Sequence, residues 1–291
     1  MHPHERVPYT PITERPKLTL PDGKHVAVWV IVNVEEWSPF EAMPRTVLTP
    51  PAGGVPTPDV PNWAWHEYGN RVGFWRMAEA LDSVGAPAAL AINGKAIESY
   101  PQITAAALER DWEFVGHGFT QKNMQKVEDE AGDIAATADA IEKATGARPR
   151  GWLGPGLTET WHTPERVKEA GYEYLCDWVL DDQPLELQTD NGPLTSVPYT
   201  QECNDVAMML IQHHQASEYR QRAIDQYEQV YADAKRDDSA RVVALVVHPY
   251  IMGAPHRARY FREALEHISG HEGSVFMTGS QIMDWYRGQA A

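Results

Sequence analysis

The chain has 291 residues, a length at which βα units commonly build one barrel domain. Its 41 acidic and 25 basic residues give a formal net charge of -16, which argues against nucleic acid or an anionic membrane surface as a partner. The two cysteines are too few for a disulfide framework. Residues 1–20 lack the apolar centre of a signal peptide, and no segment has the unbroken apolar length of a membrane span, so we expect a cytoplasmic protein.

Short β-rich runs alternate with helical segments from residue 25 onward. The expected strands cover residues 25–34, 87–92, 113–116, 151–153, 172–176, 241–247 and 274–277, with a hairpin-like region at 194–199. The expected helices cover residues 68–84, 100–110, 127–145, 164–170, 217–235, 257–267 and a last segment ending at 287. This alternation predicts an α/β fold with a mainly parallel sheet wrapped by helices. Periodicity leaves a barrel and an open sheet both possible, and the lack of phosphate-binding glycine motifs favours the barrel.

We expect residues 1–291 to form a single domain, with an N-terminal arm at 1–22 and a proline-rich loop at 38–66. Residues 39–61 contain seven prolines and show neither a helical nor a strand period. A loop of this length is typical of a lid over an active site, here over the carboxyl-end face of the barrel. An oligomer contact is the alternative.

Glu35 and Glu36 end the first apolar run and directly precede Trp37. Two like charges held at a buried strand end raise each other's pKa, which suits a general base or a metal ligand. The alternative is that the strand simply ends there and both acids face solvent.

Other predicted strand ends also carry side chains that can act in catalysis. They carry His117, the turn Gly154-Pro155-Gly156, Asp177 and His248. In βα barrels the active site is assembled from the carboxyl ends of several strands, so acids and imidazoles at these ends predict one catalytic site.

The order and spacing of these motifs resemble the polysaccharide deacetylase family, carbohydrate esterase family four, from residue 25 onward. The resembling pieces are Asn33-Val34-Glu35-Glu36-Trp37, His117-Gly118-Phe119-Thr120-Gln121, Arg150-Gly151-Trp152-Leu153-Gly154-Pro155-Gly156, Cys176-Asp177-Trp178 and Val247-His248-Pro249. The resemblance implies a distorted (β/α)7-type barrel in which the first acid is a general base and the second binds a divalent metal. Two positions depart from the family, because Gln121 replaces the second metal-binding histidine and Trp152 stands where an arginine would fall.

A branch of the family that is similar to allantoinases and cyclic imide hydrolases matches better. Its resembling pieces are Glu67-Tyr68-Gly69-Asn70-Arg71, Asp181-Asp182-Gln183-Pro184, Val197-Pro198-Tyr199-Thr200 with Asn204-Asp205, and Gly253-Ala254-Pro255 with Arg257. This resemblance implies an amidohydrolase that opens a C–N bond of a small cyclic amide, ureide or imide. Aromatic residues near the motifs, Trp37, Phe119, Trp152 and Trp178, would give flat walls for a planar ring.

From these motifs we assign Glu35 as general base, His248 as the group that protonates the leaving nitrogen or stabilises the intermediate, and Asp177 as an orienting group. The expected substrate-binding residues are Glu36, His117, Trp152, Tyr199 and Asn204. Glu36 and His117 are also the candidate ligands of a divalent metal, with zinc expected, and His66 or His248 could complete the set that Gln121 leaves short. The alternative is a metal-free site in which Glu36 and His117 bind the substrate.

Two other functions remain open at this point. One is metal-dependent N-deacetylation of an acetylated sugar, and the other is a barrel that binds a small molecule without catalysis. For each of these functions we expect a homo-oligomer that binds neither nucleic acid nor a membrane.

Overall fold

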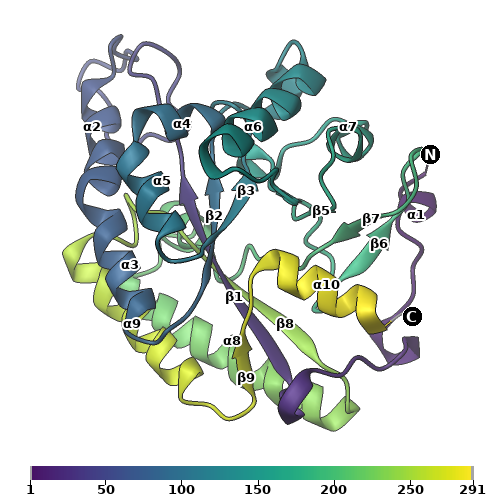
Figure 1. Cartoon of the computed structure of the whole chain (residues 1–291). Helices are drawn as coiled ribbons and strands as arrows, with labels where there is room; N and C mark the ends of the chain where they lie inside the picture. Colours follow the sequence, from purple (N-terminus) through teal and green to yellow (C-terminus); the bar gives the residue numbers. More distant parts are fainter. Residues whose placement is uncertain (1, 290–291) are drawn as a thin grey trace.

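The structure, a computed structural model, describes residues 2–289 and has one curled sheet within them (Figure 1). The strands are β1 Val26–Val34, β2 Ala88–Ile92, β3 Glu113–Gly116, β4 Gly151–Trp152, β5 Tyr174–Leu175, β6 Leu185–Leu187, β7 Leu194–Ser196, β8 Arg241–Val247 and β9 Ser274–Phe276. Their spatial order is β6-β7-β5-β4-β3-β2-β1-β8, and β9 pairs with the start of β1. All pairs are parallel except β6 with β7, so the predicted α/β barrel-type fold is confirmed.

The barrel is distorted because its two edge strands, β6 and β8, are not paired with each other in the strand order. A single parallel bridge between Asn204 and Val246 links the segment after β7 to β8 near the carboxyl ends. This bridge is important for the site, since it brings the residues that follow Asn204 to the end of β8.

Most of the helices cover the outer side of the sheet (Figure 1). The helices of the described residues are α1 Pro3–Arg6, α2 Val60–Tyr68, α3 Phe74–Asp82, α4 Gly94–Ser99, α5 Pro101–Leu108, α6 Glu130–Thr145, α7 Thr163–Glu169, α8 Ala216–Asp237, α9 Pro255–Ser269 and α10 Gly279–Gln289. None of those in the described part of the chain combines the length and apolarity needed to cross a bilayer.

The proline-rich loop is shorter than the predicted 38–66, because α2 already begins at Val60. Asp59 caps this helix, its carboxylate accepting a hydrogen bond from the backbone N–H of Asn62 at 3.2 Å. Pro61 lies in the first turn, where a missing N–H costs nothing. The loop therefore ends where α2 begins, a boundary that the proline content of the segment did not reveal.

Side chains alternate between two cores along the central strands. On β1 the five valines at even positions from Val26 to Val34 pack outward against the helices, whereas Ala27, Trp29 and Ile31 fill the barrel interior. On β8 the odd positions 243–247 face outward and the even positions 242–246 face inward. This period of two decides which residue at each strand end can enter the site.

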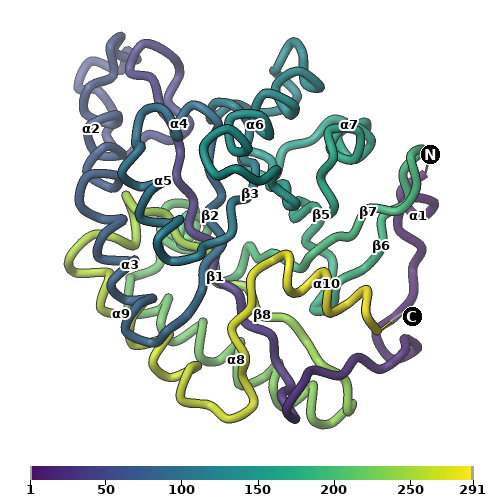
Figure 2. The backbone as a smooth tube through the Cα atoms, in the orientation of Figure 1, coloured from purple at the N-terminus to yellow at the C-terminus, as the bar shows by residue number. Residues whose placement is uncertain are grey.

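The N-terminal arm runs along the open side of the sheet and ends at the bottom of the barrel. The backbone trace places α1 beside β6 and β7 (Figure 2), where the Gln188 N–H donates to the Arg6 carbonyl at 2.8 Å. Farther along, Leu18 and Leu20 join Ile282 and Met283 of α10 in the interior core. The arm and α10 thus close the end of the barrel opposite the strand carboxyl ends.

Gly73, directly before α3, lets the backbone of that helix touch the turn that follows His248. A Cβ at this position would lie 2.2 Å from the Pro249 carbonyl oxygen. We expect Gly73→Ala to lower the free energy of unfolding by about 1–3 kcal/mol through overpacking, measured by urea denaturation. The control is Gly54→Ala, whose Cβ would meet nothing within 4 Å. Equal stabilities of the two variants would contradict this close contact.

Candidate active site

A cavity of about 170 Å³ lies at the carboxyl ends of the central strands. Five of the residues predicted from the sequence line it: Glu35, His117, Tyr199, Asn204 and His248. Other lining residues include Asn33, Arg45, Gln121, Leu153, Gly154, Gly156 and Gln201. The structure therefore gathers groups from β1, β3, β8 and the segment after β7 around one small space.

Glu35 is the buried carboxylate at the centre of the site, with 1% of its surface exposed. Its Oε2 accepts a hydrogen bond from Trp37 Nε1 at 2.7 Å, and its Oε1 accepts one from Gln121 Nε2 at 2.9 Å. Burial raises the pKa of Glu35, but hydrogen bonding and charge from His117, His248 and Arg45 outweigh it and lower the pKa to about 2. Glu35 is therefore ionised at neutral pH.

His248 is held by Asp205, a residue to which the sequence analysis assigned no role. The Asp205 carboxylate accepts the backbone N–H of His248 at 2.7 Å and lies 2.6 Å from the ring Nδ1. Because the carboxylate accepts at Nδ1, the other ring nitrogen, Nε2, is free to face the cavity and lies 3.7 Å from Glu35 Oε1. Asp205 is completely buried. The sequence named Asp205 only as part of the piece Asn204-Asp205, and its contact with His248 depends on the Asn204–Val246 bridge.

His117 is also oriented through its Nδ1, in this case by a backbone carbonyl. Its Nδ1 lies 2.6 Å from the Leu153 carbonyl oxygen, which can only accept, so Nδ1 carries the proton. The other ring nitrogen, Nε2, faces Glu35 Oε1 at 4.0 Å and Gln121 Nε2 at 3.4 Å. His117 thus directs this nitrogen into the cavity beside the carboxylate.

Asn93, at the end of β2, fixes the neighbouring strand ends and was also missed. Its Oδ1 accepts the Glu36 backbone N–H at 2.8 Å, while its Nδ2 contacts the His117 carbonyl and donates to Gln121 Oε1 at 3.0 Å. The Gln121 amide is therefore oriented with its NH₂ toward Glu35. Asn93 directly follows the predicted strand 87–92, and this place at a strand end, shared with other site residues, is the sequence signal that could have indicated it. In the structure its side chain is fully buried.

Tyr199 and Asn204 lie together on one wall of the cavity. Asn204 Nδ2 contacts the Tyr199 hydroxyl at 3.4 Å, and Asn204 Oδ1 accepts the Val206 backbone N–H at 3.0 Å. Burial keeps the pKa of the Tyr199 hydroxyl well above its usual value, so this group stays protonated and can donate.

Glu36 and Trp152 do not line the cavity, although both were predicted to bind substrate. Both residues are at positions whose side chains point outward from the barrel. Trp152 is fully buried in the outer core, with its ring centroid 5.4 Å from that of Tyr172. Burial raises the pKa of Glu36, and the charge of Glu67 raises it further. Glu36 thus belongs to an outer acidic cluster with Glu67, not to the cavity.

Asp177 also lies behind the cavity wall. Its Oδ1 accepts the Gly154 backbone N–H at 2.7 Å, which holds the turn whose residues Gly154 and Gly156 line the cavity. Burial and the neighbouring Glu159 carboxyl raise the pKa of Asp177 well above its usual value. The role this geometry supports is positioning of the turn from outside.

The residues present do not fit the predicted metal set. Glu36 and His117 point to opposite sides of the strand ends, and His66 stacks on the Trp37 ring at 4.3 Å without lining the cavity. At the position of the second family histidine, the Gln121 NH₂ donates to Glu35, and a donor cannot ligate a cation. Among residues 2–289, no group of three His, Cys, Asp or Glu side chains is arranged to hold a metal.

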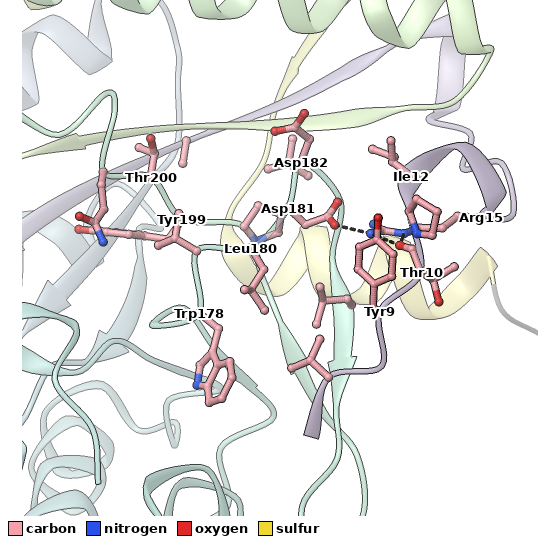
Figure 3. Close-up of a pocket in the computed structure, with 18 of the residues that line it drawn as sticks. Tyr9, Thr10, Ile12, Arg15, Trp178, Leu180, Asp181, Asp182, Tyr199 and Thr200 are labelled. Carbon is pink, nitrogen blue, oxygen red and sulfur yellow. Dashed lines mark hydrogen bonds and ion pairs between the residues drawn. The ribbon is translucent and has the colours of Figure 1, made fainter. Parts of the chain in front are cut away.

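A larger pocket of about 890 Å³ lies at the open side of the barrel, between the N-terminal arm and β8 (Figure 3). Tyr199 borders both pockets, and Trp178 lies in the larger one rather than beside the acids. An ion pair of 2.6 Å between Arg15 and Asp181 ties the arm to its far wall. Neither Glu35 nor either site histidine lines this pocket, so the smaller cavity is the candidate active site.

Comparisons with known proteins find similar chains among polysaccharide deacetylases. Residues 65–175 match the family described as polysaccharide deacetylase. A protein of Schizosaccharomyces pombe named as a polysaccharide deacetylase is 28% identical, with 90% of each chain covered. The peptidoglycan deacetylase of Helicobacter pylori is 23% identical, covering 75% of this chain and 84% of its own.

Among solved structures, the PuuE allantoinase superimposes with a TM-score of 0.83 and 20% identity over 94% of both chains, which establishes a shared fold. The family match and the curated relatives support an amidohydrolase acting on C–N bonds other than peptide bonds. Residues 65–175 therefore resemble the polysaccharide deacetylase family, and the chain shares the fold of the PuuE allantoinase along nearly its whole length.

Proposed function

We propose that this chain hydrolyses a C–N bond of a small cyclic amide, ureide or imide. The observation that carries the proposal is an ionised, buried Glu35 facing the Asp205-supported imidazole of His248 across 3.7 Å. A cavity of about 170 Å³ has room for a small ring, whereas a polymer needs an open groove.

In the proposed reaction, Glu35 takes a proton from a water molecule that attacks the ring carbonyl carbon. The C–N bond then breaks, and His248 Nε2 delivers a proton to the departing nitrogen. Asp205 stabilises the imidazolium that this transfer requires and keeps Nε2 directed at the substrate. His117, fixed through its Nδ1 by the Leu153 carbonyl, directs its Nε2 at the ring and helps to orient it.

A second candidate is N-deacetylation of an acetylated sugar. The family domain and the Helicobacter pylori relative favour it. The orientation of Gln121 counts against it, since that residue replaces a ligand of the metal used in the broader family.

The charge on Glu35 gives a stability signature independent of any substrate. Its pKa is about 2 in the folded chain against 4.5 for an unperturbed glutamate, so its contribution to stability is present above pH 4.5 and is lost as the pH falls toward 2. We expect wild type to lose about 2 kcal/mol more stability than Glu35→Gln between about pH 6 and about pH 3, measured by urea denaturation. Parallel curves for the two proteins would mean that Glu35 is not held as an anion.

Turnover tests the reaction itself. Wild type is offered hydantoin, allantoin, succinimide, glutarimide and dihydrouracil, with loss of ring absorbance as the readout, and acetylated glucosamine with acetate release. We expect ring opening by wild type, and a fall in kcat of at least about 10²-fold in Glu35→Gln, because a general base contributes about that much. Full activity of the variant would remove Glu35 from this role. Acetate release without ring opening would favour the second candidate.

Asp205 is expected to act on kcat rather than on substrate binding. Asn keeps the shape of the side chain at position 205 but loses the charge that stabilises imidazolium, so Asp205→Asn should lower kcat by about 10²-fold or more with KM nearly unchanged. The matched control is Asp181→Asn, which removes an acid from the Arg15 ion pair outside the cavity. A similar fall in both variants would show a general effect on folding.

A further inference from the structure

Arg45 reaches the cavity from the proline-rich loop and is its cationic side chain. It lines the same space as Glu35, His117 and His248. Its Nε is buried and has no hydrogen-bond partner. Within residues 2–289 no carboxylate lies close enough to Arg45 to form an ion pair with it, unlike Arg15, which is paired with Asp181 at 2.6 Å. An arginine that is partly desolvated without an acceptor is costly unless a ligand supplies one.

The loop holds Arg45 in place rather than leaving it mobile at the surface. The Asp59 N–H donates to the Pro39 carbonyl at 2.8 Å and closes the base of the loop. The buried Asn62 side chain accepts hydrogen bonds from the backbone N–H groups of Val47 and Leu48 at 2.7 and 3.1 Å, two and three residues after Arg45. These contacts build the segment that presents the guanidinium, so the cation is a fixed part of the cavity.

The surroundings keep Arg45 charged. Burial alone lowers the pKa of a guanidinium, but the Tyr250 hydroxyl and the Glu35 and Asp205 carboxylates outweigh burial and raise the pKa of Arg45 above its usual value. The Tyr250 hydroxyl is itself buried without a hydrogen-bond partner. Arg45 therefore offers charged N–H donors to the cavity that also holds the Glu35 carboxylate.

We propose that Arg45 is the anion-binding residue of this cavity and that the substrate is a cyclic amide carrying a carboxylate. The inference rests on the proposed function and narrows its substrate class. A guanidinium presents N–H donors in a planar fork that matches both oxygens of a carboxylate. With the carboxylate on Arg45, the ring is held by its substituent while the amide faces Glu35 and His248.

A carboxylate could also reach Arg45 from the product, because opening a cyclic amide creates one. The two sources are separated by a binding measurement without turnover. Glu35→Gln serves as the inactive background, and the probes are hydantoin-5-acetate and its neutral isostere hydantoin-5-acetamide, measured by titration calorimetry. The ring-opened acid of hydantoin, which carries only the newly formed carboxylate, is the third probe.

We expect hydantoin-5-acetate to bind about 10- to 100-fold more tightly than the acetamide, as for charged hydrogen bonds, and this preference to vanish in the Arg45→Gln background. Arg45→Lys should retain part of it, because the charge remains without the planar fork. Arg259→Gln, which removes an exposed arginine next to Tyr260, is the matched control and should keep the full preference.

Absence of any preference for the acetate in the background with Arg45 intact overturns the proposal, as does equal weakening of both probes by Arg45→Gln. Arg45-dependent binding of the ring-opened acid alone also overturns it, since Arg45 would then serve the product. These results differ from a failure of the proposed function. Charge-selective binding with no ring opening by wild type would reject cyclic amide hydrolysis and leave the anion site standing, whereas ring opening without charge selectivity would reject only the role of Arg45.

Discussion

The strict alternation of side chains along the parallel strands is the constraint on which the site depends. Glu35 follows Trp29 and Ile31 on the inward parity of β1, whereas Glu36 continues the outward row of valines. A shift of one residue in the register of β1 would exchange the two acids and remove the base from the cavity. The apolar pattern of the strand therefore decides which of the two carboxylates enters the cavity.

The buried carboxylates of Glu35 and Asp205 are stabilised by hydrogen-bonding partners that are already in place. Glu35 receives hydrogen bonds from Trp37 and Gln121, and Asp205 is bound to both the backbone and the ring of His248. Unpaired buried charges would cost several kcal/mol each. The site is consequently preorganised, and its polar groups need little rearrangement when a substrate enters. The loop after β1 is part of this arrangement, because it supplies Arg45.

Much of the fold was predictable because strands and helices leave periodic signals. The predicted bounds of β3 and β8 agree with the structure, whereas the start of α2 lies in a proline-rich segment and was not predicted. For the site, Glu35, His117 and His248 were correctly expected to meet, and strand parity, had it been applied, would have placed Glu36 and Trp152 outside. Asp205 could not be found in this way, because its partner His248 is 43 residues away and meets it only through the bridge to β8.

Gln121 links Asn93 to Glu35 through the two polar atoms of its side-chain amide. Its amide carries an acceptor and a donor at the same end, so it can accept from Asn93 and donate to Glu35 at once. The nitrogens of a histidine ring lie on different edges, and one of them would present a lone pair to a cation. Without a cation bound at position 121, the positive charge that stabilises the Glu35 carboxylate has to come from side chains. The groups close to Glu35 that can carry it are the imidazoles of His117 and His248 and the guanidinium of Arg45. A substrate that brings its own anion to Arg45 would draw part of that charge away from Glu35, making the carboxylate a stronger base at the moment the ring amide is in place.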